Sequence, residues 1–148
     1  MRITRNLGAT GIAIAGGLVL SACSAVSITG DAGRFMEPGI DIPLDLAVTN
    51  VHGLPIEVSA LSVAIVDVSA PFASSSHPCS AADYVVRQAP RSFELDVSPA
   101  STTHLSSTAL PRRSWPSVGM RLSQADQSGC RGARVTLDYS ASTRLVLR

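Results

Sequence analysis

The stretch ARVTLDYS, residues 133–140, decides the fold class, because apolar and polar side chains alternate through it one for one. Its apolar positions are Ala133, Val135, Leu137 and Tyr139. A period of two residues is that of a β-strand with one buried face. The stretch therefore predicts a strand that packs one side against a core.

The same alternation recurs at short intervals along the chain. The further expected strands cover residues 42–49, 56–65, 84–86, 93–97 and 118–122, with residues 145–147 as an extension or an extra edge. Pro43 favours an edge strand, because proline cannot donate to a ladder. The apolar parity changes between Val58 and Leu61, which predicts a β-bulge near Ser59 and Ala60. Residues 98–101 predict the turn of a hairpin that returns through residues 102–107.

About seven such strands, with no helical period after Cys23, predict an all-β fold built as an antiparallel two-sheet sandwich. The length of 148 residues allows one such domain. We expect a signal-peptide helix at residues 1–22, a lipidated N-terminus and flexible tether at residues 23–38, and the sandwich at residues 39–148.

The N-terminal segment has the features of an export signal. Arg2 and Arg5 precede an uncharged run over residues 7–20. As a helix this run would be about 21 Å long, less than the roughly 30 Å of a bilayer core. It therefore fits the apolar region of a signal peptide better than a membrane span.

Leu20, Ser21, Ala22 and Cys23 follow this run, and they resemble the lipobox of bacterial lipoproteins. The resemblance implies cleavage before Cys23 and a diacylglyceryl group, with fatty acids such as palmitate, on its sulfur. The protein is then expected on the extracytoplasmic face of the cell membrane, held by lipid. An ordinary secretory signal that ends in cysteine and an uncleaved apolar helix are the alternatives.

Residues 24–38 are small and polar, with two glycines and no sustained period. This composition predicts a flexible tether that holds the domain about 20 Å from the lipid. The alternative is that Phe35 and Met36 pack on the edge of the domain.

With Cys23 assigned to lipid, Cys79 and Cys130 remain, each beside a polar loop. In an exported protein a disulfide between them is favoured. Two free thiols or a pair of metal ligands are the alternatives.

The region from about residue 40 to 140 resembles Ig-like sandwich domains in exported proteins of high-GC Gram-positive bacteria. The matching segments are CSAA at 79–82, SPASTT at 98–103, WPSVGM at 115–120, GCRGA at 129–133 and LDYS at 137–140. The resemblance implies an Ig-like fold and a Cys79–Cys130 disulfide. It supplies no catalytic residues.

The charge excludes one class of partner. The twelve basic residues are all arginines, against eleven acids, for a net charge of +1. Loss of Arg2 and Arg5 would leave the mature chain slightly negative. A nearly neutral domain gives no electrostatic basis for binding nucleic acid, so no such partner is expected.

The sequence indicates no catalytic or metal-binding motif. No histidine follows Cys130 and Met120 precedes it, which does not match a blue-copper site. No Gly-x-Ser-x-Gly elbow is present. The acids mostly alternate with apolar residues, although a carboxylate pair can be assembled in space. We therefore expect no enzyme activity, metal or other cofactor.

Arg112, Arg113 and Trp115 form the one candidate binding surface. An aromatic ring and two guanidinium groups on a Pro-bounded loop have the composition of an interface hot spot. The alternative is that Trp115 closes one end of the core while the arginines are solvated.

These features together predict a membrane-anchored surface lipoprotein, with a non-catalytic binding or envelope-structural role. Its partners would be the membrane, through the lipid on Cys23, and an envelope protein or polymer. The alternative is a small cell-envelope enzyme, or an accessory subunit, with a site built from loops.

Overall fold

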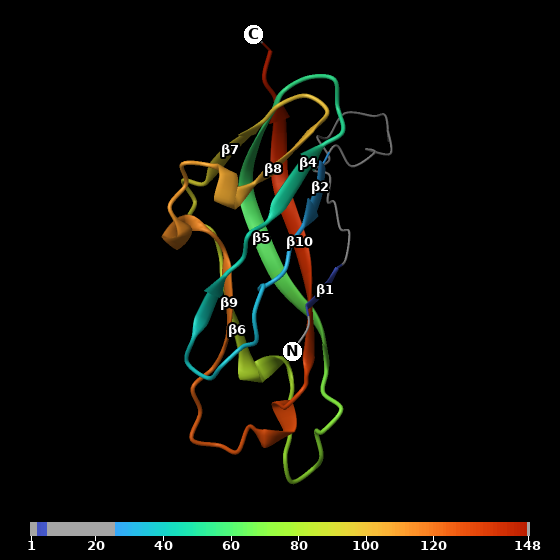
Figure 1. The fold of residues 1–148 in the computed structure, drawn as a ribbon, viewed down its shortest axis with the longest axis vertical. Coiled ribbons are helices and arrows are strands. Elements are labelled where there is room, and N and C mark those ends of the chain that lie inside the picture. The colour runs from blue at the N-terminus through green and yellow to red at the C-terminus, as the bar shows by residue number, and fades with distance from the viewer. Residues whose placement is uncertain (1–2, 6–25, 148) are drawn as a thin grey trace, which may run out of the picture.

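The computed structural model describes residues 3–5 and 26–147, which form ten β-strands and four short 3₁₀ helices (Figure 1). The strands are β1 (Ile3–Arg5), β2 (Val26–Thr29), β3 (Asp41–Pro43), β4 (Ala47–Asn50), β5 (Ile56–Ser69), β6 (Tyr84–Arg87), β7 (Glu94–Val97), β8 (Ser101–His104), β9 (Ser117–Met120) and β10 (Arg134–Leu145). The 3₁₀ helices are η1 (Ala81–Asp83), η2 (Leu105–Ser107), η3 (Arg112–Ser114) and η4 (Ser128–Cys130). The all-β prediction is confirmed. Eight of these strands lie within residues 39–148, where about seven were expected.

The strands form three sheets, in the orders β1-β10-β5-β7, β2-β4-β8 and β3-β9-β6. All pairs of strands are antiparallel except β1 with β10. Each sheet contributes fully buried side chains to one core, among them Leu137 from β10, Val48 from β4 and Val118 from β9. Burial of this apolar surface holds the three sheets together.

The longest strand pair, β5 with β10, follows the sequence pattern closely. Val135, Leu137 and Tyr139 of β10 are all buried, as their alternation predicts. Ser142 pairs with Ser59 whereas Ser140 pairs with Ser62, so β5 carries an extra residue between these points. Ala60 there has a φ of 48°. The predicted β-bulge is therefore confirmed, and it turns both halves of β5 toward the core.

The outer strand β3 contains Pro43, as the proline predicts. The strand expected over residues 118–122 is shorter than predicted. Strand β9 ends at Met120, and Leu122 is exposed. Pro43 still pairs with Ser117 of β9, from the edge of the sheet.

The expected hairpin through residues 98–101 is wrong. Strand β7 pairs with β5, while β8 pairs with β4 in another sheet. The turn therefore carries the chain from one sheet to the next.

Part of the expected flexible tether forms a strand. Residues 26–29 form β2, which pairs with β4 from Val26↔Asn50 to Thr29↔Ala47. Ile28 is buried and Met36 packs on the core, as the alternative for Met36 proposed, whereas Phe35 is exposed. Residues 26–29 of the expected tether are thus paired with a strand of the expected domain.

A partly buried hydrogen bond ties this early segment to the last strand. The Tyr139 hydroxyl donates to the carbonyl of Gly30 over 3.0 Å. Burial, with Asp31 nearby, raises the pKa of Tyr139 to about 12, so the hydroxyl keeps its proton at neutral pH. A Cβ on residue 30 would lie 2.5 Å from Leu46 Cδ2, so this close approach of backbone to core requires glycine.

The expected signal segment is described only at residues 3–5, which form β1 and not a helix. Its remaining residues, including Leu20, Ser21, Ala22 and Cys23, lie outside the described residues. Across residues 3–5 and 26–147, no helix is long and apolar enough to cross a membrane. Removal of the signal would uncover the edge of β10 that β1 pairs with, at Val135–Leu137.

Candidate functional sites

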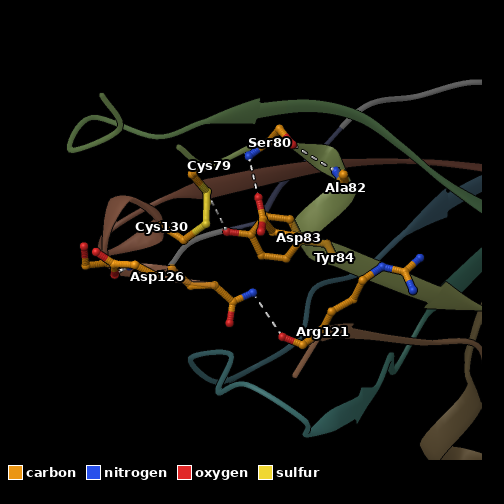
Figure 2. Close-up of a disulfide and its surroundings, with 10 residues drawn as sticks. Cys79, Ser80, Ala82, Asp83, Tyr84, Arg121, Asp126 and Cys130 are labelled. Atoms are coloured by element: carbon orange, nitrogen blue, oxygen red, sulfur yellow. Dashed lines mark hydrogen bonds between the residues drawn. A yellow bond between two sulfur atoms is a disulfide. The ribbon is translucent and has the colours of Figure 1, made fainter. Parts of the chain in front are cut away.

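The cysteines form the disulfide that the sequence favoured. Cys79 and Cys130 are bonded to each other, with a Cα–Cα distance of 5.1 Å (Figure 2). The bond joins the loop before η1 to η4, which is 51 residues further along the chain. It therefore closes the end of the domain at which β5 ends and β10 begins.

Local hydrogen bonds fix the first cysteine's loop. The Ser80 amide donates to the Asp83 carboxylate over 2.8 Å, and Ser80 Oγ accepts from the amide of Ala82 (Figure 2). The two sulfur atoms and an Asp83 oxygen lie within 4.8 Å of one another. Because the sulfurs are bonded together, they are not free thiolates and do not offer a metal a thiolate pair.

A second polar cluster lies beside the disulfide. His77 Nδ1 is 2.6 Å from an Asp126 carboxylate oxygen and 3.2 Å from the hydroxyl of Ser128. The Ser128 amide also donates to Asp126 over 2.8 Å. Hydrogen bonds from Ser128, and then from His77, lower the pKa of Asp126. The cluster therefore holds the two loops together through a carboxylate that prefers to be ionised.

This ionisation predicts a pH-dependent stability. Because the native pKa of Asp126 lies below its ordinary value of 3.8, its contribution is present above that pH and is lost as pH decreases through the native pKa. Asp126→Asn should lower the urea midpoint at pH 7, and the difference from wild type should shrink below pH 4. A difference that stays constant with pH would contradict this role. Asp67→Asn, at an exposed strand position, is the control.

The structure separates the members of the candidate binding surface. Trp115 is buried and its indole Nε1 donates to the carbonyl of Leu110 over 3.2 Å. The Arg112 guanidinium lies over the indole ring, 5.6 Å from its centroid, and Arg113 is exposed. Trp115 thus packs in the core, while Arg112 covers its outer face.

Arg112 and Trp115 also line a surface hollow of about 270 Å³. Its other charged lining residues are Arg34, Asp41 and Asp45. Asp41 is paired with Arg87, and Asp45 accepts from the amide of Ser106. The charges of this hollow are therefore balanced between acids and arginines, which favours no single sign of ligand.

Asn50 is a buried polar residue whose role the sequence did not reveal. Its amide nitrogen lies 2.9 Å from the carbonyl of Leu54, 3.3 Å from that of Val97 and 3.0 Å from that of Ser98. Its carbonyl accepts from the amide of His52 over 2.9 Å. One side chain therefore organises the loop after β4 and the turn after β7.

We expect Asn50→Ala to lower the free energy of unfolding by about 2–3 kcal/mol, because it removes the partners of several backbone groups that are wholly or partly buried. Chemical denaturation monitored by Trp115 fluorescence measures this change. Thr49→Ala, which removes only the exposed Thr49–Thr102 hydrogen bond, is the control and should cost clearly less. Equal losses for the two variants would contradict the role of Asn50.

Gln88 is an exposed residue whose role the sequence also did not reveal. Its side-chain amide accepts from Val63 N over 2.8 Å and donates to Val63 O over 2.7 Å, in the manner of a neighbouring strand. Asn50 stands just before a Gly-containing turn, but this position predicts only that it is a turn residue and not that it is buried. Gln88 gives no sequence signal, because its partner lies 25 residues away.

Comparison with known proteins found no matching family model, no matching curated protein and no matching solved structure. What this chain does therefore has to be inferred from its own residues.

Proposed function

We propose that this chain is a membrane-anchored surface lipoprotein whose β domain is a non-catalytic binding or envelope-structural module. The lipobox resemblance of Leu20 to Cys23 supports the anchor. The observation that carries the proposal is that β2, which pairs with β4, begins at Val26, three residues after Cys23. A disulfide within the domain fits the oxidising exterior of a cell.

The short connection from Cys23 to Val26 limits how far the domain can lie from an acyl group on Cys23. Three residues span at most about 10 Å, even when fully extended. An acyl group on Cys23 would therefore hold β2 at the membrane surface, without the longer tether that the sequence predicted. Such an arrangement suits a module that acts close to the lipid or to polymer immediately above it.

We also propose that the three sheets form an Ig-like sandwich, with β10-β5-β7 as one face. Two backbone hydrogen bonds support joining the other sheets into a second face. Leu44 N donates to Pro116 O over 2.8 Å and Leu105 N to Leu46 O over 3.0 Å, across the break between β3 and β4. Pairing therefore continues from β3 with β9 to β4 with β8.

The alternative is a small envelope enzyme or accessory subunit, and its best candidate site is the cluster of His77, Asp126 and Ser128. In a Ser-His-Asp relay the acid and the serine bind opposite ring nitrogens. Here both oxygens approach the same atom, His77 Nδ1. The arrangement favours a clasp between loops, and this supports the non-catalytic proposal.

Growth of the native host with an alkyne analogue of palmitate tests the proposal. We expect the analogue on this protein and partition of the protein into the detergent phase of Triton X-114. An unlabelled protein in the aqueous phase would contradict it.

A further inference from the structure

One end of the domain gathers three segments around the start of β2. Val26 pairs with Asn50, so the loop after β4 lies directly beside the first residue of β2. Ala100 N donates to His52 O over 2.9 Å, and Val146 N donates to Pro55 O over 3.0 Å. The loop over residues 51–55, the turn over 98–100 and the chain over 145–147 thus lie together at the top of Figure 1.

This end carries exposed apolar side chains, and we call it the apolar end. The exposed fractions are 62% for Val51, 46% for Leu54, 52% for Leu145 and 81% for Leu147. Leu54 and Leu145 also line an open hollow of about 220 Å³. Because Asn50 holds the loop from inside, Val51 and Leu54 are presented on a fixed backbone.

Charge distinguishes the apolar end from the opposite end. No acid or arginine occurs in residues 50–55, 98–101 or 145–147. Two arginines, Arg144 and Arg148, flank residues 145–147 in the sequence. Arg144 also lines the hollow, and it makes two hydrogen bonds to Glu57, of 2.7 and 2.5 Å, which lower the pKa of that carboxyl. At the opposite end, the exposed Phe72 and Leu122 share loops with charged residues, namely Asp83, Arg121, Asp126 and Arg131.

We propose that the apolar end rests in the headgroup region of the bilayer that holds the lipid on Cys23. The inference depends on the proposed lipid anchor, which would place Val26 within about 10 Å of the acylated residue. Apolar side chains held on a surface element enter the boundary of headgroups and acyl chains by about 5–10 Å. The disulfide-bearing loops, at the other end, would then face away from the membrane.

The contact should depend little on salt, because the exposed side chains that make it are apolar. It would add a second attachment beside the lipid and fix the orientation of the domain. A domain held only by acyl chains would instead rotate freely about residues 23–25.

Site-specific fluorescence tests the orientation. Val51→Cys and Leu147→Cys each introduce a thiol, which can be labelled with the environment-sensitive dye NBD while Cys79 and Cys130 remain bonded. Leu122→Cys is the matched control, as exposed as Leu147 but at the opposite end. The lipid-bearing protein is purified from its native membrane and placed in phosphatidylcholine vesicles. Intact mass verifies the acyl group on Cys23.

We expect the labels at positions 51 and 147 to shift to shorter emission wavelength and to resist iodide quenching, equally at low and high salt. The label at position 122 should emit as it does in water. Water-like emission at both test positions, with Cys23 acylated, would overturn the docking while leaving the anchor in place. An unacylated Cys23 would instead overturn the proposed function.

Two further outcomes would overturn the proposed contact between the apolar end and the bilayer. A blue shift that appears without vesicles and grows with protein concentration would place a second copy of the chain on the apolar end. Matched unfolding midpoints together with a shift at all three positions would contradict the orientation itself.

Discussion

Cys23→Ala is expected to abolish both fatty-acid labelling and stable membrane attachment. The thiol of Cys23 is the only proposed acceptor of the diacylglyceryl group, and alanine has no nucleophile to replace it. One buried acyl chain gives only marginal binding, with an association constant of about 10⁴ M⁻¹, whereas two give a stable anchor. Removing both chains should therefore move the protein to the soluble fraction or leave it unprocessed.

Ser24→Ala is the matched control, because it changes the neighbouring residue and leaves the acceptor thiol in place. It should be labelled like wild type. Fractionation of cells and fatty-acid labelling are read together, since an unprocessed signal segment could itself retain the protein on membranes. Labelling of Cys23→Ala at the wild-type level would contradict the anchor.

The double variant Cys79→Ala/Cys130→Ala is expected to lose about 4 kcal/mol of unfolding free energy. The disulfide closes a loop with a sequence separation of 51 residues, and the chain-entropy account of cross-links gives this magnitude for such a loop. Urea denaturation of wild type and variant measures the loss. Because a domain is stable by only about 5–15 kcal/mol, the effect should be large.

Reductant supplies the control for this variant. Wild type in dithiothreitol should unfold at the midpoint of the double variant, while the variant should not respond to reductant. A variant with the wild-type midpoint would show that the bond does not constrain the unfolded chain.

The strands in which apolar and polar residues alternate strictly were predictable. The alternation of Val135, Leu137 and Tyr139 fixed the buried face of β10, and the change of parity after Val58 located the bulge in β5. The disulfide was also favoured in advance, because only Cys79 and Cys130 remained once Cys23 was assigned to lipid. Each of these inferences uses a short pattern and one physical rule.

Features that depend on distant partners were not predictable. Strand β2 has only Val26 and Ile28 as an apolar alternation, and it is a strand because β4 lies beside it. The residues between β7 and β8 have the composition of a hairpin turn. However, β7 pairs with β5, and β8 pairs with β4. Tertiary context decides such cases.

For the candidate binding surface, the composition was readable from the sequence but the packing was not. The composition around Trp115 indicated an aromatic residue with two arginines, but it did not show which side of the ring is buried. The indole bonds to Leu110 and is covered by Arg112, so its burial follows from packing. The apolar end was missed because Val51, Leu54, Leu145 and Leu147 come together only in the fold.

The most direct test of the lipid-anchored account is the intact mass of the protein extracted with detergent from the membranes of its native host. We predict a chain that starts at Cys23 and carries the added mass of a diacylglyceryl group, with or without a third acyl chain. A chain that retains residues 1–22, or one that starts elsewhere without lipid, would contradict the account.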